Sequence, residues 1–178
     1  MPDMLHRTAF LNLAALCACA PTSALEVGST DTALDSVPPP LIEGVPDGVN
    51  DLLTSYDVEL LEHVGMTVYT GDSPPFIEGE YLMDTLSITY DDIDGAIGLD
   101  LIETWVGFQG QDPDAGTVDS TMHDAISDGT GQGGFVSGTG ECFTVWQDFH
   151  GFNGPDSCDY WMAQLFSGCI DDDGIEDL

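Results

Sequence analysis

The stretch "ECFTVWQDFHGFNGPDSCDYWMAQLFSGC", residues 141–169, contains two apolar runs on either side of a turn. The runs at 141–150 and 159–168 are rich in aromatic and β-branched residues, which favour β-strands. The Asn-Gly-Pro sequence at 153–155 lies between them and is typical of a turn. The stretch therefore predicts a β-hairpin centred on residues 153–155.

The register of this hairpin also predicts a disulfide. Pairing about the turn places Cys142 opposite residues 167–169, so we expect a Cys142–Cys169 bond. A strand from 158 to 169 would hold Cys158 about 35 Å from Cys169, at about 3.3 Å per residue, which is too far for a bond. Cys158 is then a free or intermolecular thiol. If the strand starts later, a looped Cys158 could pair instead.

Five more segments have strand composition and are separated by turns rich in glycine and aspartate: 66–70, 79–90, 101–109, 117–123 and 132–138. The connections lack crossover helices, so we expect antiparallel neighbours in a meander. One segment stays ambiguous, because Val118, Met122 and Ile126 also fit a helical spacing.

Several of these strands, such as "LIETWVGF" and "CFTVWQDF", are apolar on both faces. A sheet with one solvent-exposed face would instead alternate apolar and polar residues. A covered barrel or sandwich explains it by packing alone, which is the simpler interpretation. A barrel that encloses an apolar ligand cavity is the other.

A helical pattern precedes the strands, with apolar residues every three or four positions from residue 49 to 64. Asn50 suits the N-cap and Gly65 suits the C-terminal end. We therefore expect one short helix over about residues 50–64, with its apolar face packed on the β-domain.

The formal net charge is -32, and Arg7 is the only Lys or Arg in the 178 residues. Nucleic acid is excluded as a partner, because it is bound through Lys and Arg. The acidity fits a solvated surface adapted to salt, or alternatively weak calcium binding. The turn carboxylates considered for calcium are Asp91, Asp92, Asp94, Asp171, Asp172 and Asp173.

The N-terminus has the pattern of a secretory signal, with a cation at Arg7 and a short apolar run. It ends in "LCAC" at residues 16–19, which resembles a bacterial lipobox. We therefore expect a signal peptide over 1–18, lipidation of Cys19 and an acidic, disordered tether over 19–47. Ordinary signal cleavage after Ala20 or Ala24 is the alternative.

The sequence contains no recognisable catalytic or cofactor motif. His63, His123 and His150 are scattered without zinc-ligand spacing, and we interpret them as surface or partner-satisfied histidines. No nucleophile motif or phosphate loop is present. The expected catalytic, cofactor and metal residues are therefore none, and the protein is predicted not to be an enzyme.

Three segments of the sequence resemble those of a known protein group. The segment "GMTVYTGDSPPFIEGEY" at residues 65–81, followed by "SGTGECFTVW" and "FSGCIDDDGI", resembles a group of uncharacterised bacterial lipoproteins. The same segment is similar to the opening strand of lipocalins, with a tyrosine in place of their tryptophan. The resemblance implies a lipocalin-like β-domain and a structural motif formed by Gly71, Pro74, Pro75, Gly79 and Tyr81.

Together these patterns predict one domain over residues 48–178, with a short N-terminal helix followed by an all-β antiparallel meander barrel. The barrel is expected to be lipocalin-like and either closed or incomplete. The expected protein is a non-enzymatic lipoprotein of the cell envelope, in the outer membrane and facing the periplasm or the exterior. It would bind a small apolar ligand in the barrel. The alternative is a structural or interaction protein with a filled core.

Overall fold

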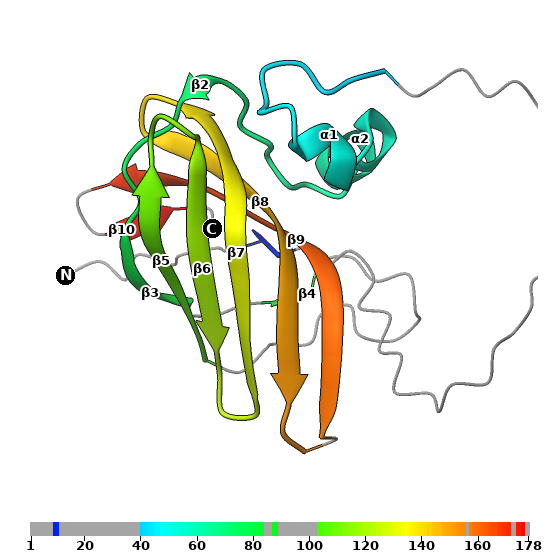
Figure 1. Ribbon diagram of the computed structural model, residues 1–178, viewed down its shortest axis with the longest axis vertical. Coiled ribbons are helices and arrows are strands. Elements are labelled where there is room, and N and C mark those ends of the chain that lie inside the picture. Colours follow the sequence, from blue (N-terminus) through cyan, green and yellow to red (C-terminus); the bar gives the residue numbers. More distant parts are fainter. Residues whose placement is uncertain are drawn as a thin grey trace, which may run out of the picture.

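The computed structural model describes residues 9–10, 40–83, 87–88, 103–155, 157–171 and 174–176. Its main element is an antiparallel meander whose strands pair in chain order and curl into a nearly closed barrel (Figure 1). The strands are β3 (Gly79–Met83), β5 (Thr104–Asp112), β6 (Thr117–His123), β7 (Ser127–Thr139), β8 (Cys142–Asn153), β9 (Cys158–Asp171) and β10 (Gly174–Glu176). The predicted all-β meander is confirmed.

Three further strands are short and lie outside the order of the meander. β2 (Asp72–Ser73) pairs in parallel with β7, which is a contact that the meander prediction lacks. β1 (Ala9–Phe10) and β4 (Ser87–Ile88) pair in parallel as a separate two-stranded sheet.

The strand predictions are confirmed for the meander but need two corrections. β6 is a strand throughout, so the helical alternative for residues 118–126 is wrong. The predicted strand at 66–70 is not one, because its backbone bonds to side chains of the sheet instead of to a neighbouring strand. Within 79–90, β3 ends at Met83 and β4 follows, with the other residues outside the described part.

The expected single helix is two helices, α1 (Val49–Leu52) and α2 (Ser55–His63). Thr54 adopts an extended conformation between them and forms a capping box with Asp57, which starts a new helix there. Asn50 is not the N-cap, since α1 is capped at Gly48, and the Asn50 Oδ1 atom accepts a hydrogen bond from Ile42 N at 2.8 Å.

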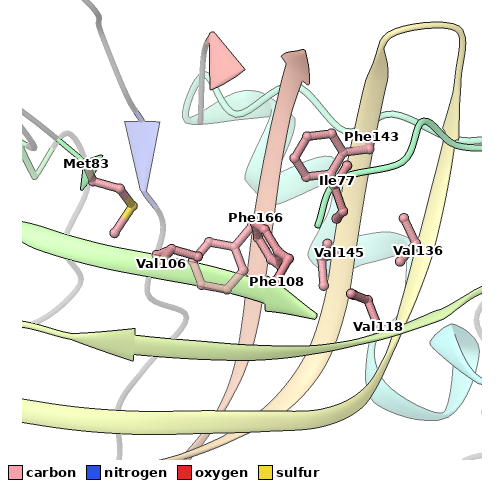
Figure 2. Close-up of a cluster of buried hydrophobic side chains, with 9 residues drawn as sticks. All are labelled: Ile77, Met83, Val106, Phe108, Val118, Val136, Phe143, Val145 and Phe166. Atoms are coloured by element: carbon pink, nitrogen blue, oxygen red, sulfur yellow. The ribbon is translucent and has the colours of Figure 1, made fainter. Parts of the chain in front are cut away.

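The two faces of the β8–β9 hairpin bury different clusters. The inner cluster lies inside the barrel (Figure 2) and consists of Ile77, Met83, Val106, Phe108, Val118, Val136, Phe143, Val145 and Phe166. The outer cluster lies where the two helices pack on the sheet and consists of Val49, Leu53, Leu61, Met66, Trp146 and Leu165. Burial on both faces explains why these strands are apolar throughout. Ile42 and Val45 also pack on the outer cluster, so the packed domain includes residues that composition assigned to the tether.

A row of three hydroxyls attaches the segment after α2 to the outer face. Ser137, Thr144 and Ser167 lie side by side on β7, β8 and β9. The Tyr69 N–H donates to Thr144 Oγ1 at 2.8 Å, and Ser167 Oγ donates to the Thr67 carbonyl. These bonds replace strand pairing for the segment 66–70.

The same row includes the indole of a buried tryptophan. Trp146 Nε1 donates to Ser137 Oγ at 2.8 Å, and Ser137 Oγ donates to the Tyr69 carbonyl at 2.7 Å. The Thr144 Oγ1 and Ser167 Oγ atoms are also hydrogen-bonded to each other, at 2.9 Å. Because each hydroxyl has one proton, the bonds form two directed chains across the three strands.

The segment from Gly71 to Tyr81 passes from the outer face into the barrel. A Cβ on Gly71 would lie 2.6 Å from the Gly138 carbonyl oxygen, and its φ of +134° also favours glycine. Beyond the two prolines, Gln111 accepts from Ile77 N and donates to the Pro75 carbonyl, at 2.8 and 2.9 Å. The turn is thereby fixed and Ile77 is fully buried in the inner cluster.

Candidate functional site

The predicted disulfide is present. Cys142 and Cys169 are directly opposed in the β8–β9 register and are bonded. The predicted hairpin is present, but the pairing of Asn153 with Cys158 puts its centre between residues 155 and 156, just after the predicted 153–155. Cys158 is also disulfide-bonded, so the expectation of a free thiol is wrong. Cys19 lies outside the described residues.

The residues of the structural motif have separate roles: Gly71 and Pro74 line a second pocket of about 290 Å³, whereas Gly79 and Tyr81 belong to β3. Tyr81 packs on the inner cluster, and its hydroxyl donates to the Ile77 carbonyl at 3.1 Å. Burial raises the pKa of the Tyr81 phenol above 10.0, because desolvation disfavours the charged form. Gly79 lies under the Tyr81 ring, where a Cβ would come within 3.0 Å of the hydroxyl oxygen.

A groove on the outer face of the sheet is the strongest candidate site. It has a volume of about 360 Å³ and lies over the ends of β6, β7 and β8 that are farthest from the helices (bottom of Figure 1). We call it the outer-face groove. Its lining residues are Thr121, Met122, His123, Asp128, Gly129, Thr130, His150, Gly151 and Phe152.

Strand register sets the walls and floor of the outer-face groove. Asp128 on β7 pairs with His123 on β6 and with Phe152 on β8, so Asp128 lies between these two residues in one cross-strand row. One step along, Thr130 pairs with Thr121 and with His150. Side chains of paired residues share a face, so these side chains project to the same side of the sheet.

Each histidine that lines the groove has a tryptophan ring parallel to its own. His150 stacks on Trp161 with ring centroids 4.2 Å apart and an interplanar angle of 16°. His123 and Trp105 are also parallel, with centroids 6.4 Å apart. The His150 Nε2 atom lies 3.2 Å from the Asp159 carboxylate, which orients the ring. Trp161 does not line the groove but is 67% exposed behind His150, so aromatic surface is accessible next to the groove.

Sequence reasoning missed this site. The sequence predicts that His123 and His150 are surface or partner-satisfied histidines, and His150 does pair with Asp159. What the sequence does not show is that the meander brings the two residues, 27 positions apart, to one groove. The available signal was an alternation: His150 and Phe152 occur in step with Trp146 along one strand, and therefore share its face. His63 ends α2 and takes no part in the groove.

The barrel interior contains interlocked side chains. The Phe108 ring meets the Phe143 and Phe166 rings edge to face, with centroids 6.1 and 5.5 Å away. Farther along the same face, Ser120 Oγ donates to Gln147 Oε1 at 2.8 Å, and Gln147 Nε2 donates to Gln164 Oε1 at 3.4 Å. Both glutamines are almost fully buried, so this polar pair is part of the packed interior.

Two further observations bear on chemistry and membrane contact. Among the described residues, no three His, Cys, Asp or Glu side chains are grouped so that they could hold a metal ion. Of the calcium-candidate carboxylates, only Asp171 lies within the described part of the chain. No helix in that part is long and apolar enough to cross a membrane.

Comparison with known proteins adds no family. No protein-family model matches the chain, and neither the curated proteins nor the solved structures contain a significant match.

Proposed function

We propose that the protein is a non-enzymatic interaction protein of the cell envelope, whose filled barrel presents the outer-face groove as a binding surface. The lipobox-like "LCAC" sequence supports an anchor at Cys19, and with it an outer-membrane location facing the periplasm or the exterior. The signal-like N-terminus and the lipoprotein-like motif at residues 65–81 support the same assignment.

The observation that carries the proposal is the contrast between the two faces of the sheet. Inside the barrel, Phe108, Phe143 and Phe166 pack edge to face and are almost completely buried. On the outer face beyond the helices, Trp161 and Phe152 are exposed beside a groove. Exposed aromatic residues gathered around a groove are typical of binding surfaces.

The competing hypothesis, an apolar ligand inside the barrel, predicts a different binding behaviour. We expect the full-length protein not to take up an apolar fluorescent probe in a saturable manner. Phe108→Ala, which removes the central ring, should create a cavity and gain such uptake. Saturable uptake by the unmodified protein would contradict the filled core and favour an apolar carrier.

The anchor is tested separately by native mass spectrometry of the protein extracted from its own membranes. We expect an acyl-modified mass on Cys19, and Cys19→Ala should lack that mass and leave the membrane fraction. An unmodified protein that still fractionates with membranes would contradict the lipid anchor. A non-covalent apolar mass on the folded domain would again favour the carrier.

A further inference from the structure

The outer-face groove combines aromatic walls with a carboxylate between them. We propose that it binds a small soluble quaternary ammonium ion, of the kind in which a nitrogen carries three methyl groups. The inference rests on the proposed function and names the ligand class of the same groove. Three properties of the described residues carry it: the ring faces, the width between them, and the charge.

The ring faces come from the two stacked pairs. Trp161 covers one face of His150, and Trp105 lies parallel to one face of His123. Both histidines line the groove, so the opposite faces of their rings are the ones available to a ligand. Phe152 lines the groove beside His150 and is 42% exposed. A ligand over β7 thus meets ring surface from both sides.

The width between these walls suits a cation with methyl groups on all sides. His123 and Phe152 lie on strands separated by one strand, or about 9.6 Å at about 4.8 Å per spacing. A group centred over Asp128 is therefore about 4.8 Å from the strand on either side, which places the Phe152 ring within the reach of about 6 Å for a cation–π interaction and leaves the His123 ring as a contact surface. Methyl groups that point both ways can contact the two walls together.

The charge of the groove selects the sign of the ligand. Asp128 lies between the walls, and no described residue forms a hydrogen bond or an ion pair with its carboxylate. Asp159 is already next to His150, at 3.2 Å. The chain has one Lys or Arg in total, at Arg7, so an anion would find no fixed countercharge in the groove.

The absence of N–H groups distinguishes a quaternary ammonium from other cations. A guanidinium group has five donors and is matched best by a bidentate carboxylate with further acceptors. In the groove the Asp128 carboxylate lies among imidazole and phenyl rings, with Thr121 and Thr130 also in the lining, and this one carboxylate suits a cation bound by charge and ring contact.

The test is calorimetric titration of the full-length protein with choline and with 3,3-dimethylbutan-1-ol, its neutral isostere. We expect saturable choline binding and at least about fivefold weaker binding of the alcohol, since only the cation gains the cation–π and carboxylate attraction. Phosphocholine should bind more weakly than choline, because its phosphate meets an acidic surface.

Matched variants localise the effect to the groove. Asp128→Asn and Phe152→Leu should each weaken choline binding by about fivefold, from loss of the charge or of the ring. Glu59→Gln on the exposed face of α2 removes the same charge elsewhere and should change binding by less than about twofold. Both groove side chains are exposed, so these variants should fold, and circular dichroism verifies this.

Several outcomes would overturn the inference. These are no saturable choline binding, equal binding of the alcohol, equal binding of phosphocholine, or equal losses in Glu59→Gln and Asp128→Asn. None of them depends on uptake of an apolar probe by the barrel. Failure of the ligand assignment is therefore distinguishable from failure of the filled-core function.

Discussion

Removing one hydroxyl from the row on the outer face should destabilise the protein far more than a surface serine does. In Ser167→Ala, the Thr67 carbonyl loses its donor and the Thr144 hydroxyl loses its acceptor. Thr144 is fully buried and Ser167 is 4% exposed, so water does not easily replace these bonds. The same row holds the segment that joins the helices to the barrel.

The expected cost follows from the groups left without partners. A buried polar group without a partner costs about 1–3 kcal/mol, and the exposed position of Thr67 places its carbonyl at the low end of that range. The sum for Ser167→Ala is about 2–4 kcal/mol of unfolding free energy. Thr144→Val keeps the side-chain shape but leaves the Tyr69 N–H without its acceptor, at a cost of about 1–3 kcal/mol.

The assay is urea unfolding followed by tryptophan fluorescence, with midpoints compared at unchanged slope. Ser73→Ala is the matched control, because Ser73 is exposed and this change should cost no more than about 0.5 kcal/mol. The double variant Thr144→Val/Ser167→Ala should cost less than the sum of the two single variants. The loss of a partner for the Thr144 hydroxyl contributes to the cost of Ser167→Ala, and this contribution disappears when valine replaces Thr144.

Hydrogen exchange gives a local readout of the same row. The Tyr69 amide should exchange faster in Thr144→Val, because its acceptor is lost. Equal costs for Ser167→Ala and Ser73→Ala, or strict additivity in the double variant, would refute the reasoning that the Thr144 and Ser167 hydroxyls belong to one directed chain.

Three other perturbations test separate features. Replacing Cys142 and Cys169 by serine removes a disulfide that spans 27 positions, which should lower the free energy of unfolding by about 3.5 kcal/mol through loop entropy. The thermal midpoint should fall accordingly, and an unchanged midpoint would argue against that bond. The raised pKa of Tyr81 means that the folded state holds its proton to higher pH, so stability should fall as pH rises above about 10. The stability of Tyr81→Phe should fall less steeply in this pH range than that of the control Tyr56→Phe, whose tyrosine is an exposed residue of α2. Identical profiles of stability against pH would contradict the assignment to Tyr81. Raising NaCl should increase the thermal midpoint by screening the charge of -32, whereas a flat response with stoichiometric calcium binding would favour the calcium interpretation of the acidity.

The parts of the fold that could be predicted are those that short-range patterns determine. The Asn-Gly-Pro sequence at 153–155 marks where the hairpin turns, and the position of the turn constrains the register. The pairing of Cys142 with Cys169 follows from that register, and so could be predicted without the structure. The alternation of β6 was likewise readable, although three of its residues also fitted a helix.

Other features depended on contacts between distant parts of the chain. Apolar spacing over residues 49–64 could not show the break at Thr54, where a capping box with Asp57 competes with a continuous helix. The segment 66–70 has strand composition, but the hydroxyls of Thr144 and Ser137 take the place of a neighbouring strand. Propensity describes a residue's preference and does not name its partner.

The sequence by itself determined the charge, the turn positions, the strand alternation and the hairpin register, because each depends on residues close together in the chain. Only the tertiary structure decided which outer surface the helices cover and which it leaves exposed. The outer-face groove exists because the registers of three strands place His123, Asp128 and Phe152 in one row. Such a row is a sum of pairings across the meander, and no local pattern contains it.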